Sequence, residues 1–224
     1  MELEIRINSE LFNEARVIAS TLVGSNSRIM QGTKFNTLFI DEAAQALEAA
    51  CWIPIRRASR VVFAGDHCQL PPTVKSMAAL KAGLGKTLME RIVENKPGVV
   101  TLLKIQYRMN EDIMRFSSDW FYHGEVVGAP QVRHRGILDY DIPMEWVSTE
   151  GEAGETGEEF VGSSFGRVNK REAQLTLDVL RQYYTKIGKQ RVLDERIDVG
   201  VISPYRAQVQ YLRALIKKLS LIHI

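Results

Sequence analysis

The sequence predicts an α/β protein with a mostly parallel sheet, and two observations support that prediction. Short apolar runs rich in Val and Ile hardly alternate with polar residues, which is typical of strands covered on both faces of a sheet. Segments with helical periodicity lie between these runs, and this alternation favours parallel strands joined by helices. A net charge of +2 and 45% hydrophobic residues fit an ordinary globular protein and neither support nor exclude a nucleic-acid partner.

Each expected element follows from a local pattern. The expected strands are the apolar runs at 16–20, 37–41, 60–66, 99–103 and 198–203. The expected helices are the periodic segments at 42–55, 110–122, 169–187 and 205–219. Asn110 opens the second of these helices, and acidic residues follow it in the first turn, which is a typical helix start.

Two further segments are expected to connect these elements. The stretch 94–99 contains Pro and Gly and is expected to link two domains, 1–97 and 98–224. The stretch 148–160 is rich in Gly and Glu, which predicts a mobile acidic loop.

Composition and termini exclude several classes of protein. Cys51 and Cys68 provide neither a disulfide framework nor zinc-ligand spacing. The charged, mixed start of the chain is not a secretory signal peptide, and no apolar run is long enough to span a membrane. We therefore expect a cytoplasmic, intracellular protein with reduced thiols and no membrane partner.

The segment "KAGLGKTLMERI", 81–92, contains the Gly-Lys-Thr triplet that ends phosphate-binding loops. That motif needs a glycine at position 80, where this chain has Leu80, and it needs a strand before the loop. The preceding residues "TVKSMAAL" are not an apolar strand. We therefore expect a helix start capped by Thr87, or a surface loop.

The segment "LFIDEAAQ", 38–45, is the strongest chemical signal. An apolar strand ends in two adjacent carboxylates, Asp41 and Glu42. An Asp at the end of such a strand can hold Mg²⁺ in nucleotide hydrolases, and the following Glu can take a proton from an attacking water. The alternative is a helix start at which the two acids only favour the helix dipole.

The segment "VVFAGDHCQLPP", 61–72, has the same arrangement of a strand followed by polar residues. Gly65 permits close approach of the backbone, and Asp66 follows it. Gln69 can orient a water or contact a phosphate, as amides do in nucleotide hydrolases. A polar loop without chemistry is the alternative, and His67 and Cys68 are too isolated to indicate a metal.

Two later segments carry basic and aromatic residues. In "KIQYRMNED", 104–112, Arg108 can reach a γ-phosphate and Tyr107 offers a ring for stacking. In "VISPYRAQVQYLRALIKK", 201–218, the turn Ser203-Pro204-Tyr205 precedes a basic helix without acids. That helix can face phosphates, or it can be a solvated surface.

The motifs "DEAAQ", "GDHCQLPP", "QYRM" and "SPYRAQ", in this order, closely resemble superfamily 1 helicases of the group that includes the nonsense-mediated-decay RNA helicase. "ARVIASTLVGSNSRI" and "RVNKREAQ" resemble two further segments of that family, and the resemblance covers about 15–218. It implies RecA-like parallel sheets with flanking helices, the P-loop NTPase fold, in parts of two tandem RecA-like domains. It also implies that "GLGKTLMERIV" closes the first of these domains.

The resemblance also implies a role for each matching residue. Asp41 would hold the Mg²⁺ of bound ATP, and Glu42 would activate the attacking water. Gln69 would sense the γ-phosphate from a loop shaped by Gly65 and Asp66.

The resemblance assigns the remaining site residues to the nucleotide and to a nucleic-acid strand. Tyr107 would stack on the base of the nucleotide, and Arg108 would act as an arginine finger. Single-stranded DNA or RNA would run across both domains, with Thr21 and the turn Ser203–Tyr205 as contacts.

The chain departs from the family pattern at both ends. The phosphate loop of the family lies before the first matching segment, and two further motifs lie after "SPYRAQ". We therefore expect a fragment of a helicase that hydrolyses ATP negligibly by itself. An incomplete first sheet would expose a strand edge, which predicts possible pairing into a homodimer.

Two alternatives remain at this point. One is a non-catalytic nucleic-acid-binding remnant of the same fold. The other is a different phosphate-handling enzyme in which Asp41, Glu42 and Asp66 hold a metal, although that would leave the order of the four motifs unexplained.

Overall fold

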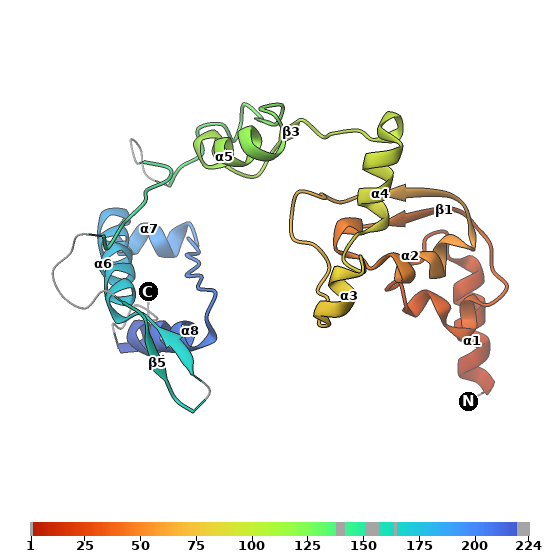
Figure 1. Cartoon of the computed structure of the whole chain (residues 1–224), viewed down its shortest axis with the longest axis horizontal. Coiled ribbons are helices and arrows are strands. Elements are labelled where there is room, and N and C mark those ends of the chain that lie inside the picture. The colour runs from red at the N-terminus through yellow and green to blue at the C-terminus, as the bar shows by residue number, and fades with distance from the viewer. Residues whose placement is uncertain (1, 138–141, 151–156, 164, 219–224) are drawn as a thin grey trace. The chain divides into compact units, whose positions relative to one another are not determined.

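The computed structural model describes residues 2–137, 142–150, 157–163 and 165–218, and the chain forms two compact units, Met1–Leu103 and Lys104–Ile224 (Figure 1). Each unit has its own short strands and helices.

The first unit is built on two parallel strands. Strand β1, Phe35–Ile40, pairs with β2, Ala58–Phe63, in a register that places Ile40 opposite Phe63. Helix α2, Glu48–Ile55, lies between them in sequence and provides the crossover that parallel strands require. Because the strands are parallel and in register, the residues that follow each strand lie at the same end of the sheet.

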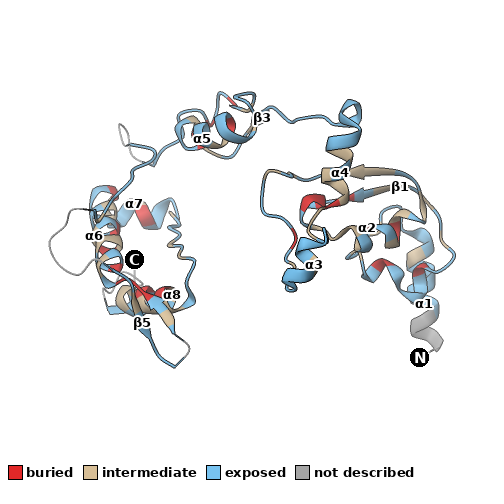
Figure 2. Ribbon diagram, in the orientation of Figure 1, coloured by how far each residue is buried: buried red, intermediate tan, exposed pale blue. Residues whose placement is uncertain are grey.

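The core of this unit lies where β1 meets its crossover. Ile40, Ala43 and Cys51 are buried together, and partly buried apolar side chains surround them. These neighbours are Leu22, Leu38, Ala46, Ile55, Val61, Phe63, Leu88 and Met89. Figure 2 shows buried residues in α2 and in the turn after β1. The acidic segment after β1 therefore rests on packed apolar groups.

Short helices complete the first unit. They are α1, Glu2–Glu14; η1, Gly24–Asn26; η2, Arg28–Met30; η3, Ala43–Gln45; α3, Met77–Lys81; α4, Leu88–Asn95; and η4, Pro97–Val99. Thr87 begins α4 with a capping box: its hydroxyl accepts from the Glu90 N–H at 3.1 Å, and the Glu90 carboxylate accepts from the Thr87 N–H at 2.6 Å. The expected helix start at Thr87 is confirmed. A helix rather than a strand precedes the Gly-Lys-Thr triplet, so the triplet is not a phosphate loop.

The second unit contains two small sheets and four helices among the residues described. Strands β3, Ile105–Gln106, and β4, Val127–Gly128, are parallel, whereas β5, Glu159–Val161, and β6, Gly166–Val168, form an antiparallel hairpin. The helices are α5, Glu111–Phe121; α6, Lys170–Ile187; α7, Lys189–Asp194; and α8, Arg206–Lys218. Val168, Ala173, Leu177, Leu180 and Leu212 are buried in β6, α6 and α8.

The expected helices are largely confirmed. Helices α5, α6 and α8 begin and end within one residue of the expected segments, and Asn110 caps α5 by accepting a bond from the Asp112 N–H at 2.8 Å. The segment 42–55 is broken into η3 and α2 because Ala46 and Leu47 have extended backbone angles. Helix α1 and the β5–β6 hairpin were not expected.

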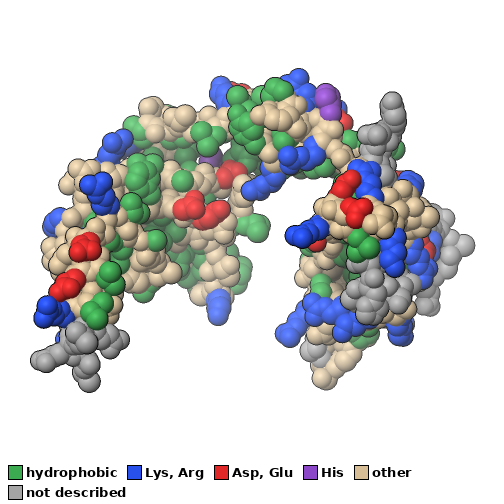
Figure 3. Space-filling view, turned by 180° about the vertical axis from the view of Figure 1, so that it is seen from behind, with side chains coloured by type: hydrophobic (Ala, Val, Ile, Leu, Met, Phe, Trp, Pro, Cys, Tyr) green, Lys and Arg blue, Asp and Glu red, His purple; other side chains and the backbone are tan. Residues whose placement is uncertain are grey.

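The expected strands are confirmed only in part. The runs 37–41 and 60–66 correspond to β1 and β2, but 16–20, 99–103 and 198–203 are not strands. A strand exists only when a neighbour pairs with it, and no described segment pairs with these three. Each run has an apolar side chain that is largely exposed, Val17 by 88%, Leu103 by 83% and Ile202 by 94%. Figure 3 shows hydrophobic side chains at the molecular surface.

Two further expectations concern the acidic loop and the membrane. Of the acidic stretch 148–160, residues 151–156 lie outside the described residues, and 159–160 belong to β5. No helix in the described part of the chain is both long and apolar enough to cross a membrane.

Candidate functional site

The two carboxylates after β1 sit on an unusual backbone. Glu42 has φ 51° and ψ 38°, in the left-handed region that non-glycine residues seldom adopt. The Asp41 carboxylate accepts a 3.0 Å bond from the Glu42 N–H, and Glu42 accepts one of 3.1 Å from the Gln45 amide. Both acids are exposed. Asp41 and Glu42 are therefore exposed acids at the end of a strand whose last residue, Ile40, is buried, and Glu42 adopts a backbone conformation of the kind that clusters at functional sites.

The loop after β2 holds Gln69 through Asp66. One Asp66 carboxylate oxygen accepts from the Cys68 N–H at 3.1 Å, and the other accepts from the Gln69 side-chain amide at 2.6 Å. The Gln69 N–H also donates to the Asp66 carbonyl at 3.2 Å. Asp66 therefore orients the amide of Gln69, and the carbonyl oxygen of that amide has no partner among the described residues.

The two loops are joined by backbone hydrogen bonds. The Ala64 N–H donates to the Ile40 carbonyl, and the Ala43 N–H donates to the Ala64 carbonyl, both at 2.9 Å. Gly65 is needed here for space, since a Cβ on it would lie 2.9 Å from the Ala43 nitrogen. The structure thus brings Asp41, Glu42, Gly65, Asp66 and Gln69 to one end of the β1–β2 sheet.

Asp41 and the loop Asp66–Cys68 offer potential metal ligands at this end of the sheet. Mg²⁺ typically takes only one or two protein carboxylates and completes its shell with waters and substrate phosphates, so the exposed Asp41 fits such an ion. The ligand atoms of Asp66, His67 and Cys68 lie within 4.8 Å of one another. Burial and the Asp66 carboxylate both raise the pKa of the Cys68 thiol, which disfavours the thiolate that binds metals.

In the second unit, Gln106 builds the loop that carries Tyr107 and Arg108. Its side-chain carbonyl accepts from the Arg108 N–H at 2.8 Å and the Met109 N–H at 2.9 Å, and its amide donates to the Met109 carbonyl at 2.7 Å. The Arg135 guanidinium donates to the Arg108 carbonyl at 2.9 Å. The Arg108 guanidinium itself is exposed and has no ion pair with a described residue, which leaves its donors available to an anion.

The expected nucleic-acid contacts lie in separate places. Thr21, in the first unit, accepts a 3.0 Å bond from the Gly24 N–H and shapes the turn before η1. In the second unit, Ser203 accepts a 3.4 Å bond from the Tyr205 N–H, and Pro204 is exposed. The Tyr205 ring lies 5.4 Å from the guanidinium of Arg167, a distance typical of a cation–π contact.

Two glutamines that organise these motifs were not predicted from the sequence. Gln208 is buried in α8, where its side-chain carbonyl accepts from the Asn169 N–H at 3.0 Å and its amide donates to the Asn169 carbonyl at 2.9 Å. Gln106 holds the Tyr107–Arg108 loop as described above. Gln208 is the last residue of the motif "SPYRAQ", and Gln106 is the first residue of "QYRM". The motifs therefore include both glutamines, although a glutamine by itself does not indicate a structural role.

Comparisons with known proteins identify the family of the chain. Two family models, each described as an AAA domain, match residues 2–77 and 84–223. The chain is 34% identical over 232 residues to an uncharacterized ATP-dependent helicase of Methanocaldococcus jannaschii. That alignment covers 97% of this chain and 32% of the helicase. It is 37% identical over 214 residues to the DNA-binding protein SMUBP-2 of Mus musculus, in an alignment that covers 89% of this chain and 21% of that protein.

A third relative is the regulator of nonsense transcripts 1 homologue of Drosophila melanogaster, 32% identical over 212 residues, with 91% of this chain and 17% of that protein covered. The chain belongs to the AAA-domain family and, within it, to the superfamily 1 helicases of the nonsense-mediated-decay group. Its mixed helices and parallel strands fit the P-loop NTPase fold, and membership of this family implies nucleotide use. It spans about a third or less of the length of these relatives.

Proposed function

We propose that this chain is part of an ATP-dependent helicase or translocase that couples ATP hydrolysis to movement along single-stranded DNA or RNA. One observation carries the proposal. The acids after β1 and the Asp66–Gln69 loop after β2 are tied together by backbone hydrogen bonds at the carboxyl end of a parallel sheet. Ligands of open α/β sheets bind at this end.

The roles proposed for the nucleotide site follow from exposure and hydrogen bonding. Asp41 holds Mg²⁺, and Glu42, whose carboxylate is oriented by Gln45, takes the proton of the attacking water. Gln69 presents its amide to the γ-phosphate from the loop of Gly65 and Asp66. These three functions need exposed polar side chains held by hydrogen bonds, and Asp41, Glu42 and Gln69 meet that condition.

The roles proposed for the second unit use the exposed Arg108 guanidinium and two exposed tyrosine rings. Arg108 acts as an arginine finger, since its guanidinium is exposed on a loop stiffened by Gln106. Tyr107, which is 63% exposed, stacks on the base of the nucleotide. Tyr205 and the Ser203–Tyr205 turn contact the nucleic-acid strand, as does Thr21 of the first unit.

Binding of a fluorescent ATP analogue to the whole chain, with and without Mg²⁺, tests the nucleotide site. We expect magnesium-dependent binding that Asp41→Asn and Arg108→Ala each weaken and that Glu42→Gln leaves intact, because a general base acts after binding. Glu14→Gln is the matched control, since Glu14 is exposed on α1 and makes no hydrogen bond with a described residue.

Two outcomes would contradict the assignment. One is equal binding with and without Mg²⁺, and the other is an effect of Glu14→Gln as large as that of Asp41→Asn. Binding of an oligonucleotide together with an absence of magnesium-dependent nucleotide binding would favour the non-catalytic nucleic-acid-binding alternative.

Two features of organisation are also proposals. The first is that 1–97 and 98–224 are parts of two tandem RecA-like domains, a boundary that lies near the division of the structure after Leu103. The second is that an exposed sheet edge pairs two copies of the chain. A light-scattering mass twice that of the 25.4 kDa chain would support the homodimer, and a mass equal to one chain would exclude it.

A further inference from the structure

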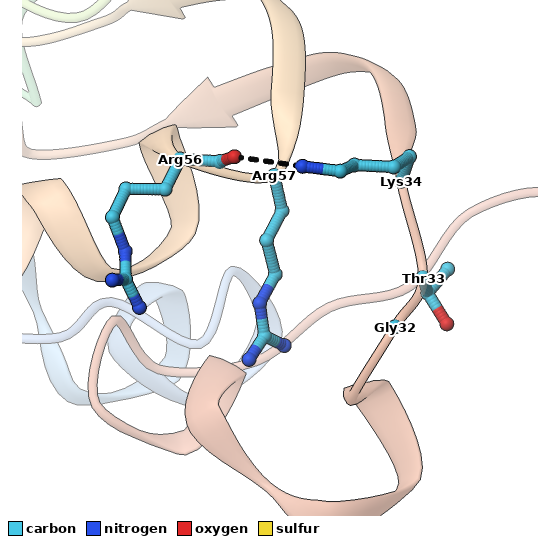
Figure 4. Close-up of a pocket in the computed structure, with 5 residues that line it drawn as sticks. All are labelled: Gly32, Thr33, Lys34, Arg56 and Arg57. Atoms are coloured by element: carbon cyan, nitrogen blue, oxygen red, sulfur yellow. Dashed lines mark hydrogen bonds between the residues drawn. The ribbon is translucent and has the colours of Figure 1, made fainter.

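A basic hollow lies at the opposite end of the β1–β2 sheet from Asp41. Its volume is 330 Å³, and Gly32, Thr33, Lys34, Arg56 and Arg57 line it (Figure 4). Lys34 immediately precedes β1, and Arg56 and Arg57 immediately precede β2. A six-residue strand is about 20 Å long, so this hollow is separate from the candidate nucleotide site.

Backbone contacts hold the two sides of the hollow together. The Phe35 N–H donates to the Arg57 carbonyl at 2.8 Å, which extends the pairing of the strands backwards by one residue. The Lys34 ammonium donates to the Arg56 carbonyl at 3.2 Å, and Figure 4 shows Lys34 reaching across to that carbonyl. The three cationic residues therefore line one hollow at the start of the sheet.

Hydrogen bonds hold the Arg57 guanidinium in place without using all of its N–H donors. One guanidinium nitrogen, Nη1, donates to the carbonyls of Ser25 and Met30, each at 2.9 Å, and Nη2 donates to the Asn26 side chain at 3.3 Å. Arginine carries five N–H donors, so two remain for another acceptor. A guanidinium held in place loses little entropy when it binds an anion, which favours recognition of a ligand.

Arg56 and Lys34 supply further donors. Arg56 is exposed, and its guanidinium makes no hydrogen bond or ion pair with a described residue. Lys34 uses one of its three donors on the Arg56 carbonyl. The carboxyl end of α2 carries a partial negative charge, which disfavours an anion here. That charge is equivalent to about half an elementary charge, whereas the three side chains carry three full positive charges. Among the residues that the structure describes, no acidic side chain lines the hollow.

We infer that this hollow binds phosphate groups through Lys34, Arg56 and Arg57. Arginine and lysine donors around a small open hollow suit a tetrahedral oxyanion, and the open mouth admits a phosphate that belongs to a larger molecule. The source of the phosphate is either the backbone of a nucleic-acid strand or a free phosphoanion. In the first case the inference rests on the proposed function, and in the second it is independent of it.

Arginine Nε–H resonances in the NMR spectrum of the whole chain test the inference directly. We expect sodium pyrophosphate to shift the Arg57 resonance in a saturable way, relative to sodium chloride at equal ionic strength. Arg56→Ala and Lys34→Ala should each raise the dissociation constant about threefold to tenfold, since each removes one charged contact at an open site. Arg60→Ala is the matched control, because Arg60 is an exposed β2 arginine outside the hollow.

An oligothymidylate titration then distinguishes the source. If it shifts the Arg57 resonance and pyrophosphate competes with it, the hollow takes the backbone of a strand, whereas a shift with pyrophosphate alone identifies a free phosphoanion. The inference is overturned if neither ligand moves the Arg57 resonance, or if Arg60→Ala weakens binding as much as Arg56→Ala. The nucleotide site is tested by a different measurement, the loss of magnesium-dependent nucleotide binding in Asp41→Asn. Asp41 lies at the other end of the sheet, so the proposed function and the phosphate-binding hollow can fail independently of each other.

Discussion

The Ala43 N–H donates a 2.9 Å hydrogen bond to the carbonyl of Ala64, and this bond joins the acidic turn after β1 to the loop after β2. The two residues lie in different motifs of the sequence. Their bond continues the pairing of the strands for one step beyond the sheet. It thereby fixes the position of the backbone next to Glu42 relative to the backbone that leads to Asp66. The geometry of the candidate nucleotide site therefore depends on close contact between two backbones.

Gly65→Ala tests that contact. An added Cβ would lie 2.9 Å from the Ala43 nitrogen and 3.1 Å from the Ala44 nitrogen, so one loop must move. We expect a cost of about 1–3 kcal/mol. If this cost lowers the free energy of local opening, hydrogen exchange of the Ala43 amide should accelerate about fivefold or more.

Gly98→Ala is the matched control, since nothing lies within 4 Å of a Cβ at that position. Equal exchange rates at the Ala43 amide in the wild-type chain and in Gly65→Ala would refute the close contact.

Thr87→Ala tests whether the Gly-Lys-Thr segment is a helix cap. Thr87 is buried, and its hydroxyl and backbone both bond to Glu90. Loss of the hydroxyl should destabilise the first unit by about 1 kcal/mol, measured as a lower midpoint of urea unfolding. Thr87→Ser keeps the cap and should lose much less. If both variants unfold at the wild-type midpoint, the cap contributes nothing.

Gln208→Ala tests the link between the motifs "SPYRAQ" and "RVNKREAQ". Truncation removes both hydrogen bonds that join the Gln208 side chain to the Asn169 backbone, at a cost of about 0.5–1.5 kcal/mol for each bond. We expect faster hydrogen exchange of the Asn169 amide. Gln210→Ala, on an exposed position of the same helix, should leave that rate unchanged. An unchanged rate in Gln208→Ala would count against the link.

Alkylation of Cys68 tests the electrostatics of the Asp66 loop. Burial first, and then the negative Asp66 carboxylate, raise the pKa of the Cys68 thiol. The thiolate is the reactive form, so alkylation at neutral pH should be slow and should rise with pH above the usual range of a thiol. Asp66→Asn removes the negative charge and should lower the pKa, which predicts faster alkylation of Cys68 at neutral pH.

Cys51 provides the internal control for that experiment. Its pKa is raised by burial and by Glu48, so Asp66→Asn should not change its rate. A rate for Cys68 that is equal in the wild-type chain and in Asp66→Asn would show that the carboxylate does not act on the thiol.

Local chemistry in the sequence was enough to locate the starts of α4, α5 and α6. Thr87, Asn110 and Asn169 each cap a helix through a backbone N–H two or three residues away, so the letters alone predict the bond. The order of the four motifs likewise identified the family before any geometry was known. The candidate site residues Asp41, Glu42 and Gln69 follow strands that the apolar runs predicted.

Only the tertiary structure decided which apolar runs are strands and what holds the motifs in place. The runs 37–41 and 60–66 pair with each other, whereas 99–103 is also rich in apolar residues and has no described partner. Gln208 reaches a residue 39 positions away, and Arg57 reaches Ser25 across 32 positions. Strand pairing and these long-range bonds depend on which segments meet in space, and a local sequence pattern carries no information about that.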